Sequence, residues 1–475
     1  PDHLPLSYAQ RRLWLLGQID GVSSTYNIPM ALRLSGALNV AALSVALEDV
    51  VARHESLRTT FVEVDGVPYQ QITEIGAIGS LLEKADITEA ELSAALSAAA
   101  GYCFDLATEL PIRGWLYHLN ADQHVLLLVI HHIAGDGWSF APLAKDLTLA
   151  YEARIRGEAP DWVPLPVQYA DYTLWQHELL GDESDSDSAI AHQLSYWQDT
   201  LKGLPEQLDL PVDRPRPTKA SHRGGYIPIT ITSELHGKLL DLAREAQSSL
   251  FMVLQAGLAA LLTRLGAGND IPLGSPIAGR MDDALDELVG FFVNTLVLRT
   301  DTSGNPSFRE LLSRVRETDL QAYAHQDIPF ERLVEALNPT RSFASHPLFQ
   351  VMLALQNNVT ASLDLPSMEV TAEPVDTDTA KFDLWFSFSE QRGDDGKPQG
   401  LVGQLEYACD LFDEETVETL MGRLVHLFEL VVDNPDHSIG SFELLDEDER
   451  QKILFDWNDT TQPIPDATLP ELFEA

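Results

Sequence analysis

Two adjacent histidines and a nearby aspartate are the side chains in this sequence best placed to do chemistry. His131 and His132 end an unbroken apolar run, and Asp136 follows four residues after His132 within Gly135-Asp136-Gly137. A neutral imidazole can accept a proton or a hydrogen bond, and a carboxylate can orient an imidazole or pair with a distant arginine. The cluster is therefore a candidate for general base catalysis or substrate positioning. The alternative is that the histidines are packing residues satisfied by nearby carbonyls.

The elements that must position this cluster are a strand, a turn and a helix. The run 125–130 is too short to span a membrane and is typical of a strand buried on both faces. Gly135 and Gly137 predict a sharp reversal, and Ser139 stands where it could cap a helix over residues 140–157. Successive strand side chains point to opposite faces, so only one of His131 and His132 can face a given cavity.

A metal site is the other possible use of paired histidines, and it requires further ligands. The two cysteines, Cys103 and Cys409, stand in neither a CxxC pair nor a histidine cluster. We therefore predict no metal. Two isolated cysteines also indicate a reducing compartment without a disulfide framework.

Composition excludes some classes of function. The 475 residues include 31 basic and 73 acidic side chains, a net charge of −42, which disfavours binding to nucleic acid or to anionic lipid. The sequence shows no basic leader followed by an apolar segment and no apolar run of membrane-spanning length. We expect a soluble, cytoplasmic protein. The first residue, Pro1, and the ending LPELFEA predict a piece of a longer polypeptide.

The order of elements predicts a mixed α/β fold with two lobes of similar character. We place the domains at 1–176, 177–456 and 457–475, because an acidic run at 181–189 and a proline-rich stretch at 208–225 have no apolar periodicity. In the second lobe we expect a buried helix over 248–266, a strand over 289–300, and a helical region over 306–337, with Ser233 capping an earlier helix.

Seven stretches resemble, in order, the core motifs of the condensation domains of nonribosomal peptide synthetases. HHIAGDG at 131–137 matches the HHxxxDG motif of that family. The other stretches are SYAQRRLW at 7–14, RHESLRTTF at 53–61, YADYTLW at 169–175, VGFFVNTLVLR at 289–299, HQDIPFE at 325–331 and RSFASHPLFQV at 341–351. Residues 457–475 resemble the linker that leads into an adenylation domain.

The resemblance implies two lobes like chloramphenicol acetyltransferase, arranged as a V with a tunnel between them. It implies that the α-amine of an aminoacyl group on a downstream carrier protein attacks a peptidyl or aminoacyl thioester on an upstream carrier. His132 would be the functional residue, and the supporting residues would be His131, Asp136, Gly137, Arg280 and Asn294. Asp136 would pair with Arg280 in a structural role. The domain would bind no cofactor of its own, because the carriers deliver the phosphopantetheine arms.

Alternatives within and outside the family remain. Heterocyclisation domains replace HHxxxDG with a two-aspartate motif that this chain lacks, and FFVNT with HQDIPFE follows the condensation pattern rather than the epimerisation one. The SYAQRRLW opening is more similar to members that use an L-configured donor. A non-catalytic module that only docks a partner is the rival of a different class. We expect two further groups to be structural: Arg53, Arg58, Tyr169, Asp171 and Trp175 in the first lobe, and His325, Asp327 and Glu331 around Pro329.

Overall fold

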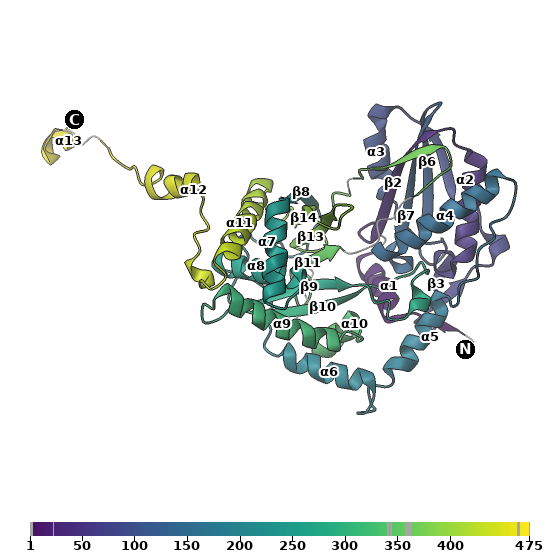
Figure 1. Ribbon diagram of the computed structural model, residues 1–475, viewed down its shortest axis with the longest axis horizontal. Helices are drawn as coiled ribbons and strands as arrows, with labels where there is room; N and C mark the ends of the chain where they lie inside the picture. The colour runs from purple at the N-terminus through teal and green to yellow at the C-terminus, as the bar shows by residue number, and fades with distance from the viewer. Residues whose placement is uncertain are drawn as a thin grey trace.

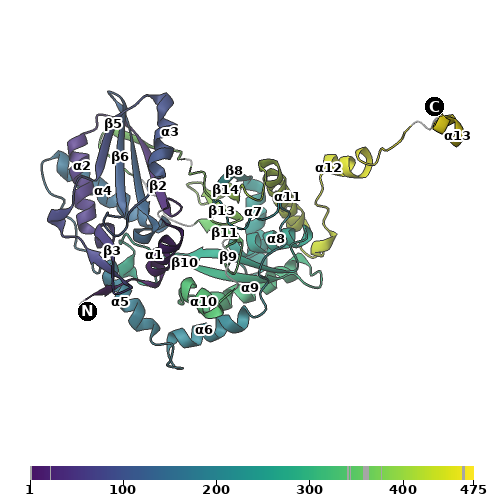
Figure 2. The ribbon, with the colours of Figure 1, turned by 180° about the vertical axis from the view of Figure 1, so that it is seen from behind.

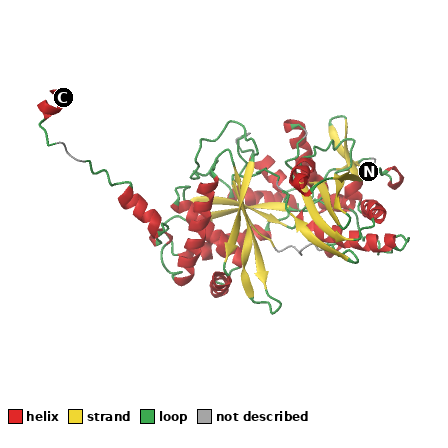
Figure 3. Cartoon of the chain, turned by 90° about the horizontal axis from the view of Figure 1, so that it is seen from above, coloured by secondary structure: helices red, strands yellow, loops and turns green. Residues whose placement is uncertain are grey.

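A computed structural model describes residues 3–21, 23–339, 342, 344–356, 363–375, 377–462 and 466–474. These residues form two lobes, each built around one β-sheet that helices cover (Figure 1). Figure 3 shows the two sheets as separate groups of strands. The predicted mixed α/β fold with two lobes is confirmed. Residues 341 and 343 of the last predicted motif lie outside the described part of the chain.

The sheet of the first lobe has the strand order β12-β2-β7-β6-β5. Its strands are β12 (Met368–Glu373), β2 (Asn27–Gly36), β7 (Gln123–His131), β6 (Ile112–Asn120) and β5 (Leu82–Asp86). Only β5 and β6 pair in parallel; β12–β2, β2–β7 and β6–β7 are antiparallel. The predicted strand that ends in the two histidines is therefore the central strand of this sheet.

Alternate residues of β7 belong to two separate cores, which explains the unbroken apolar run. Side chains at the even positions 126–130 pack in a cluster with those of α2 (Val40–Arg53) and α4 (Phe140–Ile155). Side chains at the odd positions 125–129 pack with α3 (Glu89–Ala100) on the opposite face. Both faces of the strand are thus removed from water over residues 125–130, which is why these six residues are all apolar.

The sheet of the second lobe has the order β10-β9-β11-β13-β14-β8. Its strands are β10 (Asn294–Asp301), β9 (Asp270–Ile277), β11 (Val351–Gln356), β13 (Leu384–Arg392), β14 (Pro398–Ala408) and β8 (Gly224–Ile231). The helices of this lobe include α7 (Ser233–Glu245), α8 (Leu250–Arg264), α9 (Phe308–Ala324) and α11 (Glu414–Asp433). The predicted buried helix is confirmed as α8, whose residues 252–262 are all buried.

Two elements join the lobes. Strand β12, the green strand among purple and blue ones in Figure 1, comes from the second half of the chain and pairs with β2. Helix α5 (Tyr169–Leu180) leads toward α6 (Ala189–Thr200), and residue 176, the predicted boundary, lies inside α5. A third, small sheet combines β1 (Leu4–Pro5), β4 (Val67–Ile72) and β3 (Thr59–Val64) beside α1 (Tyr8–Asp20). The division at 176 stays a prediction.

Three local predictions in the second half were wrong. The predicted strand 289–300 begins only at Asn294, because residues 289–293 hydrogen bond to side chains of the first lobe. The predicted helical region 306–337 is interrupted, since α9 ends at Ala324 and Pro329 precedes α10 (Phe330–Leu337). The cap of α7 is Thr232, whose hydroxyl accepts a hydrogen bond from the backbone of Leu235 at 3.3 Å, rather than Ser233.

The last described residues lead away from the second lobe (Figures 1 and 2). This tail contains α12 (Glu447–Gln451), a π-helical turn over Lys452–Asp456, and α13 (Leu469–Glu474). Within the described ranges, no single helix combines the length and hydropathy needed to cross a bilayer; α7 and α8 meet that test only as a pair bent by 101°.

Candidate active site

The two histidines at the end of β7 have different surroundings, as the alternation of strand side chains predicts. His131 is buried in the first lobe: its Nδ1 accepts a hydrogen bond from the backbone N–H of Ile133 at 3.1 Å, and its ring meets Phe104 edge-on at 6.1 Å. The ring of His132 instead faces Phe291, from the second half of the chain, with centroids 4.9 Å apart. His131 is thus engaged in local packing, whereas His132 lies at the junction of the lobes.

His132 carries a nitrogen without a partner. Its backbone N–H donates to the carbonyl oxygen of Tyr26 at 2.8 Å, which fixes the residue at the end of the strand. Its Nδ1 is buried and has no hydrogen-bond partner in the described part of the chain. Burial, together with the charge of Lys381 and the neighbouring His131, holds the pKa of His132 well below its usual value, while backbone groups of His132 and Gly135 beside the ring oppose that shift. The imidazole is therefore neutral at physiological pH.

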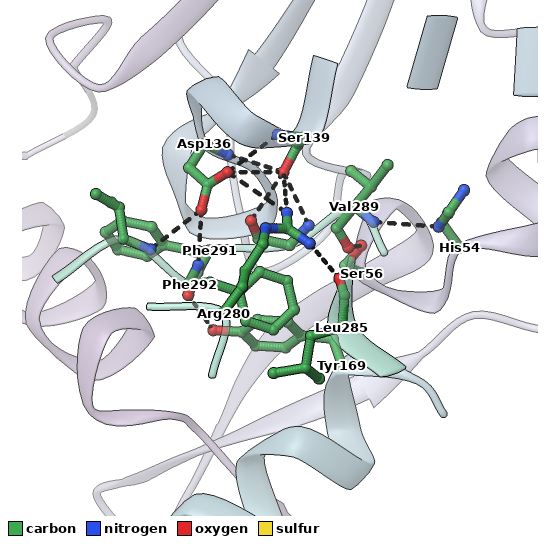
Figure 4. A network of polar contacts seen from close by, with 12 residues as sticks. His54, Ser56, Asp136, Ser139, Tyr169, Arg280, Leu285, Val289, Phe291 and Phe292 are labelled. Atoms are coloured by element: carbon green, nitrogen blue, oxygen red, sulfur yellow. Dashed lines mark hydrogen bonds and ion pairs between the residues drawn. The ribbon is translucent and has the colours of Figure 1, made fainter. Parts of the chain in front are cut away.

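Asp136 is saturated with hydrogen bonds (Figure 4). Its Oδ2 accepts from the backbone N–H groups of Phe292 and Val293 at 2.9 and 3.1 Å, and its Oδ1 accepts from the backbone and hydroxyl of Ser139 at 3.1 and 3.0 Å. The guanidinium Nη2 of Arg280 lies 3.7 Å from Oδ1. Burial raises the pKa of Asp136, and Arg280 and these donors oppose that rise. The carboxylate joins the two lobes and has no free oxygen to orient an imidazole.

Residues 289–293 of the second half are held by first-lobe side chains, and we name them the bridging segment. The N–H of Val289 donates to His54 Nδ1 at 3.3 Å, while Ser56 donates to its carbonyl at 2.6 Å. The hydroxyls of Ser139 and Tyr169 donate to the carbonyls of residues 290 and 291 at 2.9 and 2.7 Å. Every residue of the segment therefore exchanges a backbone hydrogen bond with the first lobe, as Figure 4 shows.

Ser139 has a different role from the predicted one. It occupies the position before α4, but its side chain makes no cap hydrogen bond to that helix. Its hydroxyl instead bonds the backbone N–H of Asp136 at 3.2 Å and both backbone groups of Gly290, at 2.9 and 3.1 Å. The predicted N-cap position is confirmed, but the hydroxyl of Ser139 makes its hydrogen bonds between the lobes instead of capping the helix.

Arg280 follows a glycine that the fold requires. Gly279 has φ +66°, and a Cβ there would lie 1.8 Å from the carbonyl oxygen of Phe292. The guanidinium of Arg280 stacks over the ring of Phe292 at 4.3 Å and donates to the carbonyl of Leu285. Burial lowers the pKa of Arg280, and Asp136 opposes that shift. The arginine thus braces the bridging segment from the side of the second lobe.

Asn294 is engaged inside the second lobe. Its amide donates to the carbonyls of Gln326 and Ile328 at 3.0 and 2.9 Å and accepts from the N–H of Phe330 at 3.0 Å. It also lines a pocket between α1, α5 and the loop before α10, to which Phe291 contributes. Gly137 is exposed in the turn before α4. Phe291 therefore contacts the ring of His132 and also lines the pocket beside Asn294.

The side chains expected to be structural make structural contacts. Arg53 donates to Asp146 at 2.8 Å within the first lobe. Near Pro329, Asp327 accepts from Gln193 at 2.6 Å, and Glu331 pairs with Arg12 of α1 at 3.4 Å. No group of three or more histidine, cysteine, aspartate or glutamate side chains that could hold a metal occurs among the described residues.

Sequence reasoning missed Lys381 and His54. Lys381 precedes strand β13 as a single lysine without a motif, and His54 follows α2 inside a motif that was assigned to first-lobe packing. The signal for His54 was its place in RHESLRTTF; its imidazole is fully buried, with Nε2 2.7 Å from Asp146. For Lys381 the sequence offered only a cation just before an apolar strand.

Comparison with known proteins identifies the family. The condensation-domain family model matches residues 1–454. The dimodular nonribosomal peptide synthase of Bacillus subtilis (strain 168) is 56% identical over 474 residues, which cover 100% of this chain and 20% of that protein. The isonitrile lipopeptide synthase of Mycobacterium tuberculosis is 47% identical over 482 residues, which cover 100% of this chain and 19% of that protein. The chain belongs to the condensation-domain family of nonribosomal peptide synthetases, and it spans a fifth or less of these two relatives.

Solved structures share the fold. The X-domain in a complex with OxyB from teicoplanin biosynthesis superposes with a TM-score of 0.89 at 36% identity, covering 94% of this chain and 97% of that one. The first condensation domain of the calcium-dependent antibiotic synthetase, in complex with a substrate analogue, superposes with a TM-score of 0.74 at 20% identity, covering 94% and 100%. The second likeness shows the two-lobed fold alone.

Proposed function

We propose that this chain forms an amide bond between two carrier-bound substrates. The α-amine of an aminoacyl thioester on a downstream carrier attacks a peptidyl or aminoacyl thioester on an upstream carrier, with an L-configured donor. The carriers supply the phosphopantetheine arms, and an adenylation domain is the expected neighbour. The observation that carries the proposal is the neutral imidazole of His132, a partly buried ring at the junction of the lobes that meets Phe291 of the second half.

The state of His132 favours one of its two possible roles. A general base works best when its pKa lies near the operating pH, and the pKa of His132 is held well below that range by burial and by Lys381. An α-amine has a pKa of about 7.7–8.0, so a minor but useful fraction is already the free nucleophile at neutral pH. His132 would therefore mainly orient the amine by accepting a hydrogen bond from its N–H.

Positioning is then the largest contribution of the domain. Holding both thioesters in one tunnel between the lobes replaces an encounter in solution, which can lower the barrier by several kcal/mol. Asp136, Arg280 and Asn294 would act indirectly, because their polar groups hold the bridging segment and the loop before α10. Gly137 would mark where the turn comes close to the substrate.

The test is condensation between two separately loaded carrier proteins, followed by intact-protein mass spectrometry. We expect dipeptide on the acceptor carrier with the native chain and about 10²-fold less with His132→Ala, because the amine loses the group that orients it. His118→Ala is the matched control, because His118 pairs with His124 at the opposite end of β7 from His132 and contacts Asp86 at 2.7 Å. Undiminished product with His132→Ala would remove His132 from the mechanism. A faster reaction of D-terminated than of L-terminated donors would reject the proposed donor configuration.

A second candidate function is recruitment of a partner without catalysis. It is favoured by the likeness to the X-domain, whose structure was solved in complex with OxyB at a TM-score of 0.89 to this chain. Under this alternative, native chain and His132→Ala would bind carriers equally and neither would form product with any substrate pair. Product from the native chain alone would exclude it.

A further inference from the structure

A partly buried lysine from the second lobe lies beside the histidine pair. Lys381 precedes β13, and its backbone N–H donates to Glu406 of β14 at 3.3 Å, which anchors it in the second sheet. Its Nζ lies over the ring of Tyr26, 5.2 Å from the centroid. The carbonyl of Tyr26 accepts the N–H of His132 at 2.8 Å. Lys381 therefore contacts the first-lobe residue that holds His132 in place.

The ammonium group of Lys381 lacks a close carboxylate. Within the described part of the chain, no aspartate or glutamate oxygen lies within 4.0 Å of its Nζ. Burial lowers the pKa of Lys381, and Glu406 is the acidic neighbour that opposes the shift. A partly buried cation without a closely paired anion is costly, and the partial exposure of Lys381 leaves it within reach of a substrate, so its position beside the histidines indicates a role in function.

The positive charge of Lys381 lowers the pKa of both histidines. It contributes to the lowered pKa of His131, about 3, and to the lowered pKa of His132, in both cases after burial itself. The titratable groups that face one another here are Lys381 and Glu406 from the second lobe and the two histidines from the first. A cation in this place repels further positive charge and attracts negative charge.

We propose that Lys381 is a catalytic residue of the second lobe, whose ammonium group stabilises the negative charge that develops on the thioester carbonyl oxygen. This inference rests on the proposed function. In the step, the amine nitrogen bonds to the thioester carbon and the carbonyl π-electron pair moves to oxygen. The C–S bond then breaks, the proton lost from the amine goes to the departing thiolate, and the amide forms. Lys381 keeps its own proton throughout, and the oxyanion is the charge that it meets.

The experiment compares Lys381→Met with Lys381→Arg in the two-carrier assay. Methionine keeps most of the length and removes the charge, so we expect kcat to fall about 100-fold with KM changed less than about threefold. Arginine keeps the charge, so we expect recovery to within about tenfold of the native kcat. Lys397→Met is the matched control, because Lys397 is exposed and pairs with Asp395 at 2.8 Å in the β13–β14 turn.

Two readouts separate this role from a structural one. We expect Tm of Lys381→Met to equal or exceed that of the native chain, because the substitution removes a partly buried charge. We expect histidine NMR to show higher imidazole pKa values for His131 and His132 in that variant and unchanged values in Lys397→Met. The proposal is overturned if Lys381→Met keeps kcat within about twofold, if lost activity comes with a lowered Tm that Lys381→Arg restores, or if the histidine titrations do not move.

Failure of the proposed amide-forming function would give a different result from failure of the role proposed for Lys381. Without product from the native chain, amide formation itself is rejected and the catalytic role of Lys381 with it. The NMR titration still reports whether the charge of Lys381 acts on the histidines, because it requires no substrate.

Discussion

His132 and Asp136 belong to one short motif, yet the structure treats them in opposite ways. Both oxygens of Asp136 are occupied, by backbone N–H groups of the bridging segment and by Ser139. The Nδ1 of His132 is equally buried but has no partner in the described residues. A saturated group holds structure, whereas a buried polar atom left unpaired is costly unless a substrate can meet it. The contrast shows that Asp136 holds the lobes together, and it is consistent with our proposal that the ring of His132 contacts substrate.

The first way to break this comparison is Asp136→Ala. The substitution leaves Arg280 buried without its partner and removes four acceptor contacts, so we expect the free energy of unfolding to fall by about 3–5 kcal/mol. Urea unfolding at pH 7 measures the loss. Asp395→Ala, at an exposed ion pair with Lys397, should cost no more than about 0.5 kcal/mol. A loss below about 1 kcal/mol for Asp136→Ala would contradict its assembly role.

A second test uses pH and His131. Its pKa is lowered to about 3 in the folded chain, so the unfolded chain binds the proton first and stability is lost as pH falls below about 6.5. Between pH 7 and pH 5 this loss amounts to about 2 kcal/mol. His131→Asn keeps an acceptor for the N–H of Ile133 and should remove that much acid sensitivity from urea unfolding curves.

The control for the pH test is His118→Asn, which changes an exposed histidine. An equal acid sensitivity of the native chain and His131→Asn would show that His131 is not held neutral by burial.

The smallest expected effect concerns the middle of the bridging segment, at Phe291. Tyr169 is buried, and its hydroxyl donates to the carbonyl of Phe291 at 2.7 Å and lies 2.9 Å from the hydroxyl of Ser7. Tyr169→Phe should lower the free energy of unfolding by about 1–2 kcal/mol, because that carbonyl loses its donor. Tyr226→Phe, at an exposed position, should be neutral in the same unfolding experiment. A neutral result for both variants would mean that Phe291 is positioned without this hydrogen bond.

Much of the fold could be predicted, because the relevant signals are local. The apolar run before His131 required a strand buried on both faces, and alternation along it separated the surroundings of the two histidines. The strand predicted to begin at residue 289 was wrong because that prediction also used only local signals. The apolar sequence of residues 289–293 is typical of a strand, but its backbone bonds to His54, Ser56, Asp136, Ser139 and Tyr169 instead of to a neighbouring strand.

The sequence by itself determined the strand, turn and helix around the histidines, the two-lobed mixed fold and the membership of the family. Tertiary structure alone decided which polar groups have all their hydrogen-bond partners within the described residues and which do not. It placed Lys381 beside a histidine pair some 250 residues earlier in the chain and brought β12 onto the first sheet. The physical reason is that local patterns report which side chains must leave water, whereas hydrogen bonds and charges between distant residues depend on how the lobes meet.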